Sequence, residues 1–334
     1  MNQMEWTSKD VLKISGGYWL SCTIQAAIKL DVFSIIGTNS LTMEQVASAC
    51  HADLRAMSML LNALVAWGLI EKKEDHLSCT PFSQDFLCKD SPKYIGYMIM
   101  HHHYLVNSWN QLDQSILTGK PVRKVSSHTN DDRQRESFLM GMFNNAMATA
   151  PEVCKYVDLK DKTQLLDLGG GPGTYSIHYC QKNPQLRAKV FDLPTTRPFA
   201  EKTIQKFGLS DQIQFIEGNY KTDDIQGQYD VAWLSHILHA EGPDMCQQII
   251  NKTYNVLSNG GLIFIHEFIL NSSMDAPLFP ALFSLNMLTG TENGQSYSED
   301  QLFQMLKNAG FNNMERLKFK GPTDSGIIVG VKPL

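Results

Sequence analysis

A glycine-rich segment in the middle of the chain has the residue types of a ligand-binding loop. Residues 165–173 read LLDLGGGPG, a short apolar run that ends in glycines, and a helical pattern follows at residues 175–182. Glycines let the backbone approach a ligand and adopt turns that other residues avoid. Because ligands of open α/β sheets bind beyond the carboxyl ends of the strands, the sequence predicts a binding site here.

The spacing of these glycines bears on the class of ligand. A dinucleotide-binding loop has the pattern GxGxxG, and a phosphate-binding P-loop contains GK followed by Ser or Thr. Gly169, Gly171 and Gly173 instead give GxGxG, and the segment lacks GK[ST]. The third class is an adenosyl ligand without phosphates, which has a ribose to be held.

A carboxylate after the next predicted strand favours this third class. Asp192 ends the strand predicted at residues 188–192, shortly after the loop. A carboxylate can accept hydrogen bonds from both hydroxyls of a ribose. The alternative is that Asp192 only caps the turn before Pro194. Taken together with the loop, we expect Asp192 to bind the ligand.

The elements that would position this loop alternate between strand and helix from Thr163 onward. The predicted strands are residues 165–168, 188–192, 213–217, 229–234 and 262–268. The predicted helices are residues 175–182, 198–207 and 245–257, and Asn259-Gly260-Gly261 closes the last of them. This alternation predicts an α/β domain, with a mostly parallel sheet covered by helices on both faces.

The N-terminal part of the chain, up to about Leu159, has helical periodicity instead. Thr42 and Gln45 form a capping-box pattern, a helix at residues 54–67 ends at Gly68, and a short hairpin follows. This is the outline of a winged helix. A DNA-recognition helix needs polar and basic residues. Because residues 54–67 are mostly apolar, we expect burial against a partner helix or subunit instead.

Composition excludes several classes of partner. The chain has 334 residues, 43% hydrophobic residues and a formal net charge of −5, so we expect neither nucleic acid nor a membrane as a partner. The seven scattered cysteines form no CxxC pair, which indicates reduced thiols. No signal peptide or membrane-spanning stretch is visible, and we expect a cytoplasmic protein.

A set of segments, in order and at suitable spacing, carries a family resemblance. They are LLDLGGGPGTYS, VFDLP, IEGNY, LSHILHAEGPDMC, NGGLIFIHEFIL and YSEDQLFQMLKNAGF, with WNQLDQSILTGKP and FNNAM before them. The chain resembles the S-adenosylmethionine-dependent small-molecule O-methyltransferases of the plant caffeate and bacterial antibiotic-biosynthesis type. The resemblance implies a Rossmann-like methyltransferase sheet and an N-terminal winged-helix-like dimerisation domain. The expected domains are residues 1–95 for dimerisation, 96–160 for a helical linker and acceptor region, and 161–334 for catalysis, in a homodimer.

The resemblance also implies a set of residues that bind the cofactor. S-adenosylmethionine is the expected donor and S-adenosylhomocysteine the product. The glycine loop would lie at the methionine part, Asp192 at the ribose and Asn219 with Tyr220 at the adenine. Asn219 departs from the usual Gly-Asp pair of the family, although an Asn side chain can still accept a hydrogen bond. The cofactor-binding residues expected are Asp167, Gly169, Gly171, Asp192, Asn219, Tyr220 and Ser235.

His239 matches the position of the general base in this family. A histidine at the carboxyl end of a strand can take the proton of a phenol as the new bond forms. Glu267 matches the first acidic partner of that base, whereas Ser296 stands where a second one would be. Three residues earlier, His236 is expected to point elsewhere unless the segment is helical. Glu241 replaces an aromatic residue of the family.

Five further residues match or resemble positions that line the acceptor. Each could equally belong to the core, because their spacing is helical. They are Phe143, Asn144, Met147, Asn286 and Met287. We expect no metal ion, since three consecutive histidines at residues 101–103 cannot converge on one ion.

The predicted function is methylation of a hydroxyl on a small aromatic or polyketide-like molecule, with a histidine as the general base. Two alternatives remain open. One is C-methylation of a similar molecule, and the other is a catalytically degenerate regulatory protein that binds S-adenosylmethionine.

Overall fold

The computed structural model describes residues 5–124 and 131–334. The chain forms two compact units. The N-terminal unit comprises residues 1–105 and 136–144, and the C-terminal unit comprises residues 106–135 and 145–334. Two long helices, α7 (Gly96–Trp109) and α9 (Asp132–Tyr156), contribute residues to both units.

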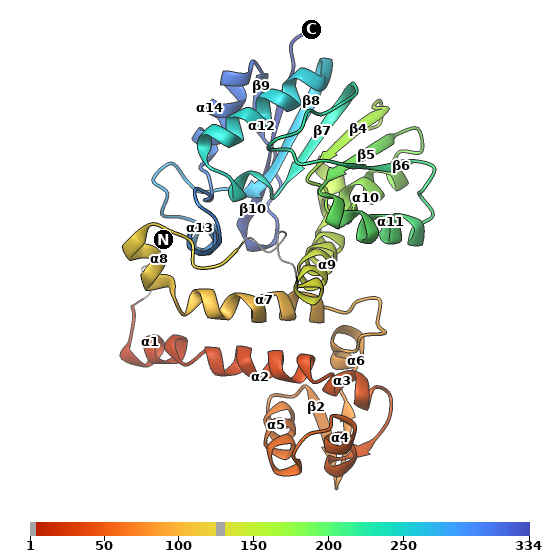
Figure 1. Cartoon of the computed structure of the whole chain (residues 1–334), viewed down its shortest axis with the longest axis vertical. Helices are drawn as coiled ribbons and strands as arrows, with labels where there is room; N and C mark the ends of the chain where they lie inside the picture. The colour runs from red at the N-terminus through yellow and green to blue at the C-terminus, as the bar shows by residue number, and fades with distance from the viewer. Residues whose placement is uncertain (1–4, 125–130) are drawn as a thin grey trace. The chain divides into compact units, whose positions relative to one another are not determined.

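The N-terminal unit is mostly helical and has a small antiparallel sheet (Figure 1). Besides parts of α7 and α9, its helices are α1 (Ser8–Ser15), α2 (Tyr18–Lys29), α3 (Val32–Ile36), α4 (Met43–Ala49), α5 (Leu54–Ala66) and α6 (Pro81–Leu87). Its strands are β1 (Leu41–Thr42), β2 (Ile70–Lys73) and β3 (His76–Cys79), in the order β1-β3-β2. The helices α4 and α5 followed by the β2–β3 hairpin confirm the winged-helix outline.

Local sequence signals explain these elements. The Gln45 amide donates to Thr42 Oγ1 at 3.3 Å and the Thr42 amide donates to Gln45 Oε1 at 2.8 Å, so the predicted capping box is confirmed. Met57, Leu61 and Leu64 of α5 are at most 2% exposed and belong to the core of this unit. The apolar face of α5 is therefore buried within its own domain.

The C-terminal unit contains a seven-stranded sheet in the order β6-β5-β4-β7-β8-β10-β9 (Figure 1). The strands are β4 (Gln164–Leu168), β5 (Arg187–Asp192), β6 (Ile213–Glu217), β7 (Tyr229–Ser235), β8 (Leu257–Phe268), β9 (Asn312–Arg316) and β10 (Ser325–Val331). Strands β4 to β8 pair in parallel, and β10 is antiparallel to both neighbours. The mostly parallel sheet predicted from the sequence is confirmed.

Helices cover both faces of this sheet. They are α10 (Thr174–Lys182), α11 (Arg197–Lys206), α12 (Pro243–Val256) and α14 (Glu299–Ala309); α8 (Leu112–Thr118) and α13 (Leu278–Gly290) complete the unit, with 3-10 turns at Pro194–Thr196, Leu238–Ala240 and Pro322–Asp324. On one face, Trp233 of β7 packs 5.0 Å from Tyr175 of α10. On the other face, Leu234 joins the cluster that includes Ile250 of α12. Neighbouring residues of a strand thus point to opposite layers.

One predicted boundary was wrong. The segment Asn259-Gly260-Gly261 was expected to be a turn before a strand at residues 262–268, but β8 already begins at Leu257. Residues between Leu257 and Leu262 bulge out of the pairing with β7, and Gly260 has φ +73°. The Gly260 amide donates to Lys332 O at 3.0 Å, which draws these glycines into the sheet.

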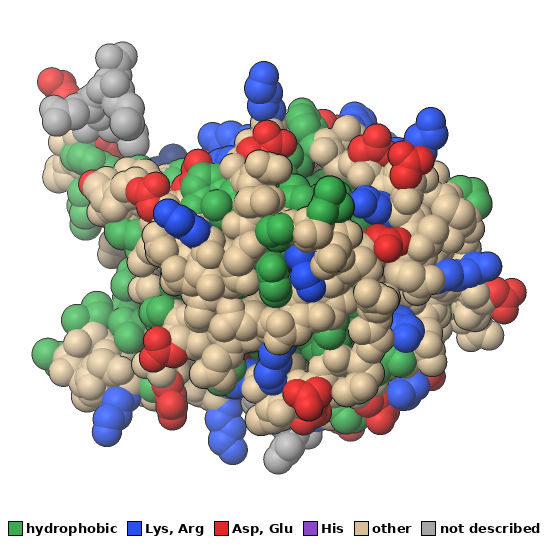
Figure 2. Space-filling model, turned by 90° about the horizontal axis from the view of Figure 1, so that it is seen from above, with side chains coloured by type: hydrophobic (Ala, Val, Ile, Leu, Met, Phe, Trp, Pro, Cys, Tyr) green, Lys and Arg blue, Asp and Glu red, His purple; other side chains and the backbone are tan. Residues whose placement is uncertain are grey.

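The surface carries charges of both signs. Figure 2 shows Lys and Arg side chains interspersed with Asp and Glu side chains over the face in view. Among the described residues, no helix is long and apolar enough to cross a membrane.

Candidate active site

The order in which the chain adds strands to the sheet reverses beside β4. The chain proceeds from β4 to β5 and β6 on one side and then returns to β7 on the other side. Loops that follow β4 and β7 diverge at such a point and leave room for a ligand at the carboxyl edge. The predicted glycine loop follows β4, and the predicted base follows β7.

Backbone conformation explains the glycines of this loop. Gly169, Gly171 and Gly173 have φ of +65°, +55° and +80°, a region that glycine adopts without strain. A Cβ on Gly169 would lie 2.6 Å from Cγ2 of Ile237, so no side chain fits there. A Cβ on Gly171 would meet no atom within 4 Å, and the backbone at Gly171 therefore faces open space.

Asp192 ties the glycine loop to the next turn. Its Oδ2 accepts from the Gly171 amide at 2.8 Å, and its Oδ1 accepts from the Leu193 amide at 2.7 Å and from Thr196 Oγ1 at 3.1 Å. Burial raises the pKa of Asp192 despite these bonds. The capping role weighed as an alternative is therefore present, and it places the carboxylate directly beside the open backbone of Gly171.

Asp167 presents an unsatisfied acceptor below the loop. Its Oδ2 accepts from Ser176 Oγ at 2.7 Å, whereas its Oδ1 is buried and has no hydrogen-bond partner. Burial raises the pKa of Asp167 to about 7. A Cβ on Gly170 would lie 2.6 Å from the carboxyl carbon, so glycine is needed here too. A glycine cradle with two desolvated carboxylates fits a ligand that has both hydroxyl groups and positive charge.

The other predicted cofactor residues lie at the same edge. The ring of Tyr220 lies 3.5 Å from a Cβ built on Gly169. Asn219 Oδ1 accepts from the Lys221 amide at 3.0 Å, so its acceptor is used within its own loop. Ser235 Oγ lies 3.0 Å from Nδ1 of His266. The adenine role of Asn219 stays a prediction, and its free side-chain group is the amide nitrogen.

An ion pair that sequence reasoning missed connects the two loops. Lys221 Nζ, after β6, lies 2.9 Å from Glu241 Oε2, after β7. Lys252 Nζ of α12 donates to the carbonyls of Tyr220 at 3.3 Å and Lys221 at 3.0 Å, which anchors the first loop. The only sequence signal was Glu241 in place of an aromatic residue of the family.

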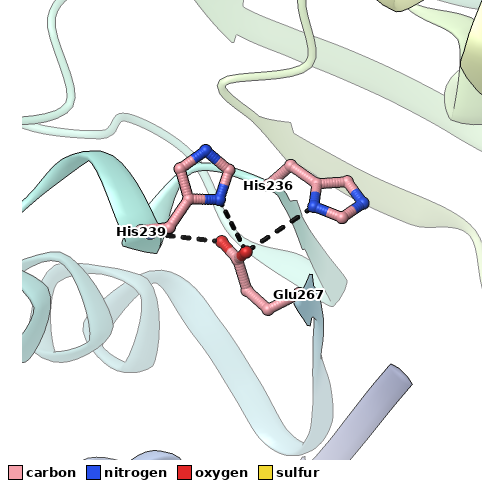
Figure 3. Close-up of side chains that lie close together, drawn as sticks. All are labelled: His236, His239 and Glu267. Carbon is pink, nitrogen blue, oxygen red and sulfur yellow. Dashed lines mark hydrogen bonds and ion pairs between the residues drawn. The ribbon is translucent and has the colours of Figure 1, made fainter. Parts of the chain in front are cut away.

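His239 and Glu267 form a buried pair (Figure 3). His239 Nδ1 lies 2.7 Å from Glu267 Oε2, and Glu267 Oε1 accepts from the Leu238 amide at 2.9 Å and the His239 amide at 3.3 Å. Burial alone would raise the pKa of Glu267, but the charges and hydrogen bonds of His239 and His236 hold it well below its usual range. The carboxylate accepts from Nδ1–H and leaves Nε2 as the basic nitrogen.

The expectation that His236 points elsewhere was wrong. Its Nδ1 lies 3.6 Å from Glu267 Oε2, so both histidines face one carboxylate (Figure 3). His236 has φ +57°, and a 3-10 turn at Leu238–Ala240 follows. This left-handed residue turns the chain back toward β8. His236 itself is not helical, so a left-handed backbone and not a helix brings the two histidines together.

Aromatic rings surround the histidines. The ring of Phe268 stacks 6.0 Å from that of His239 and lies 4.4 Å from that of His236. Phe283 of α13 lies edge-on 4.8 Å from His239, and Phe279 packs 5.0 Å from Phe268. These side chains give the base an apolar, ring-lined environment suited to an aromatic molecule.

Among the described residues, Glu267 is the only acid paired with His239. Ser296, at the expected place of a second acid, is 1% exposed, and its hydroxyl has no hydrogen-bond partner. Nitrogen and oxygen atoms of His236, His239 and Glu267 all lie within 4.8 Å of one another and could hold a metal ion. Because the carboxylate already accepts from four N–H groups, we keep the metal-free prediction.

The predicted acceptor residues fall in different places. Asn286 and Met287 lie on α13, where Asn286 Oδ1 accepts from Arg123 Nη2 at 3.4 Å and Met287 is 8% exposed. Phe143 and Asn144 belong to the N-terminal unit, where the Asn144 amide donates to the carbonyl of Tyr94. Met147 belongs to the C-terminal unit. The acceptor roles of all five stay predictions.

Comparison with known proteins shows the family of the chain. Residues 109–312 match the model of the O-methyltransferase domain, and residues 12–89 match that of the O-methyltransferase dimerisation domain. The chain belongs to the O-methyltransferase family. It is an α/β methyltransferase-fold enzyme of this family, and its N-terminal region is a dimerisation domain.

Relatives cover almost the whole chain. A 3-hydroxy-5-methyl-1-naphthoate 3-O-methyltransferase of Streptomyces sahachiroi is 27% identical over 324 residues, 96% of this chain and 94% of the relative. An L-tyrosine C(3)-methyltransferase of Streptomyces lavendulae is 27% identical over 98% of this chain and 95% of the relative. Human N-acetylserotonin methyltransferase, solved with S-adenosylmethionine, has a TM-score of 0.85 at 24% identity and covers 100% of each chain, which supports the fold.

Proposed function

We propose that this protein methylates a hydroxyl of a small aromatic or polyketide-like molecule, with His239 as the general base. The observation that carries the proposal is the buried His239–Glu267 pair. Nδ1 of His239 lies 2.7 Å from Oε2 of Glu267, so Nε2 is the nitrogen that remains to accept a proton. The pair follows β7, next to the switch point that also bears the glycine loop.

The methyl donor is S-adenosylmethionine, which supplies a methyl group activated by a positively charged sulfur. Gly169 and Gly171 would lie along its methionine part, and Asp192 at its ribose. Asp167, which is 1% exposed, would lie beneath the loop and act on the positive charge of the donor without touching it. The product S-adenosylhomocysteine lacks the sulfonium charge, so a negative charge on Asp167 would favour the donor over the product.

His239 would remove the proton of the acceptor hydroxyl. A phenol, with a pKa of about 10, is a weak nucleophile near neutral pH, and an imidazole with a pKa of about 6.5 can accept its proton as the bond forms. Glu267 would stabilise the resulting imidazolium through Nδ1–H. The rings of Phe268 and Phe283, whose centres lie 6.0 and 4.8 Å from that of His239, would limit the access of water to the base.

C-methylation of a similar molecule is the second candidate. It is favoured by the relative named as an L-tyrosine C(3)-methyltransferase, whereas the relative named as a naphthoate 3-O-methyltransferase favours the hydroxyl. The same histidine could take a proton in either reaction. The position of the added methyl group separates the two.

We propose in addition that the protein acts as a homodimer through its N-terminal unit in the cytoplasm. Apolar side chains of α1 and α2 are exposed, with Leu12 at 71%, Trp19 at 69% and Ile14 at 65%. An apolar surface of this kind is typical of a subunit interface. Light scattering of a Leu12→Asp, Trp19→Asp double variant should give the mass of one chain, against two for the wild type.

A mass-spectrometric screen of phenols tests the proposed reaction. We expect a gain of one methyl on oxygen, located by fragmentation, and its loss in His239→Gln but not in His76→Gln, an exposed histidine of β3. Methylation on carbon would favour the second candidate. S-adenosylmethionine binding with no product from any acceptor would favour the regulatory protein.

A further inference from the structure

Arg123 joins the segment after α8 to the last turns of α13. Its amide and that of Val122 donate to the carbonyl of Thr289 at 3.1 and 3.0 Å. Its Nη2 donates to Asn286 O at 3.2 Å and Asn286 Oδ1 at 3.4 Å, and its Nη1 donates to Lys124 O at 3.3 Å. The guanidinium is thus held firmly against one end of a single helix.

The acceptors that the described residues offer this guanidinium are all neutral. In the part of the chain that the structure describes, no carboxylate lies within 4.0 Å of Arg123. Its Nε is buried and has no hydrogen-bond partner. Burial lowers the pKa of Arg123, and no neighbouring acid opposes that effect. A desolvated cation without an anion is costly, and the end of α13 supplies only a partial negative charge.

Arg123 and His239 both contact one face of α13. Phe279, Phe283, Asn286 and Gly290 are spaced four, three and four residues apart, which places them on the same face of the helix. Phe283 contacts the ring of His239 at 4.8 Å. A Cβ on Gly290 would overlap the guanidinium carbon of Arg123, so the missing side chain makes room for the cation.

The spacing of these residues on α13 also gives the distance between the base and the cation. Phe283, beside the base, and Gly290, beside the cation, are seven residues apart, or about 10 Å along the helix axis. An acceptor that spans the distance from the base to the guanidinium would have its hydroxyl at His239 and a negatively charged group at Arg123. Two fused rings that bear a hydroxyl and an anion on opposite sides have about this reach.

We infer that the methyl acceptor is a hydroxylated aromatic carboxylic acid whose carboxylate pairs with Arg123. The inference rests on the proposed function and narrows its substrate class. A planar guanidinium suits a carboxylate because it can donate two parallel hydrogen bonds. Arg123 acts here as a specificity residue, while His239 performs the proton transfer.

Pairs of acids and esters test this role. Hydroxybenzoic and hydroxynaphthoic acids, each with its methyl ester, are assayed for methylation and for binding to the protein loaded with S-adenosylhomocysteine. We expect the wild type to prefer acids. Arg123→Gln should weaken binding of the preferred acid about 10-fold or more, the range for a hydrogen bond to a charged group. Binding of the corresponding ester should change little. Arg123→Lys should give an intermediate loss.

The control is Arg316→Gln, which removes the surface ion pair of Arg316 with Glu299 at 2.9 Å and should leave the acid-to-ester ratio unchanged. A purely structural Arg123 would lower the unfolding temperature and affect acid and ester alike. If Arg123→Gln does not fold, Arg123→Lys alone decides, because it retains the charge and loses the planar fork.

Two results would overturn the inference: a wild type that prefers the esters, or the same acid-to-ester ratio in wild type and both Arg123 variants. His239-dependent methylation of neutral phenols alone would then leave the proposed function standing. Failure of every acid and ester to bind or react would count against both.

Discussion

The two sides of the site are built differently. On the glycine-loop side (residues 169–173 with Asp167 and Asp192), the surface is mostly backbone with positive φ, and two carboxylates lie beneath it. On the histidine side, His239, Phe283 and Arg123 come from segments far apart in the sequence. A surface of backbone atoms suits a ligand that does not vary, such as the cofactor. A surface of separate side chains allows the specificity for the acceptor to change by single substitutions.

Removal of the Asp192 carboxylate should have the largest effect on the glycine-loop side. Asp192→Ala should weaken S-adenosylmethionine binding by about 1.5–3 kcal/mol, the range for hydrogen bonds to a charged group. Calorimetry measures this directly. The control is Thr196→Val, which removes only the bond from Thr196 Oγ1 to Asp192 Oδ1 at 3.1 Å. An equal loss in both variants would mean that Asp192 acts only through the turn.

Two glycines with similar backbone conformations allow the cradle to be tested separately from the fold. Gly171 and Gly208 have φ of +55° and +68°, and a Cβ on either would meet no atom within 4 Å. Alanine at either position should therefore destabilise the fold by a similar amount, about 1–2 kcal/mol. Only Gly171→Ala should also weaken cofactor binding, by about 1–3 kcal/mol, because the added methyl group overpacks the site. Equal cofactor affinities in the two variants would mean that the cofactor does not contact Gly171.

Proton release should be the smallest effect on this side. The pKa of Asp167 is raised to about 7 by burial, so its carboxyl is about half protonated at pH 7. A cationic ligand favours the ionised form, and S-adenosylmethionine binding should release up to about half a proton. Calorimetry in buffers of different ionisation enthalpy measures it, with Asp167→Asn as the comparison.

The same pKa fixes the pH dependence of stability. Because the folded pKa of Asp167 lies above the unfolded value of about 3.9, the folded state holds more protons between those values, and its stability falls as pH rises from about 4 to 7. Asp167→Asn should remove that part of the fall. A parallel decline in wild type and variant would contradict the raised pKa.

Sequence reasoning succeeded where the signal is local. Thr42 and Gln45 define a cap within four residues, and the glycine spacing with Asp192 follows from a strand, a turn and the next strand. His239 and Glu267 were predicted as the base and its acidic partner because both stand in motifs that resemble a family, and the structure places them in contact. Their mutual contact depends on the parallel pairing of Ser235 with His266 in β7 and β8.

It failed where long-range packing decides. The left-handed φ of His236 turns its ring to Glu267, and no neighbouring residue type announces that conformation. The Lys221–Glu241 pair joins loops that three strand spacings separate in the sheet. Arg123 meets Asn286 across more than 160 positions, so its lack of an acidic partner becomes visible only in the folded chain.

The central claim is that His239, held by Glu267, takes the acceptor proton. Single-turnover methylation by His239→Gln, with S-adenosylmethionine affinity measured in the same preparation, tests it most directly. We predict a rate about 10²–10⁴ lower than wild type, the usual contribution of a general base, with cofactor affinity unchanged. An unaltered rate at unchanged affinity would contradict the claim and leave the protein acting by proximity alone.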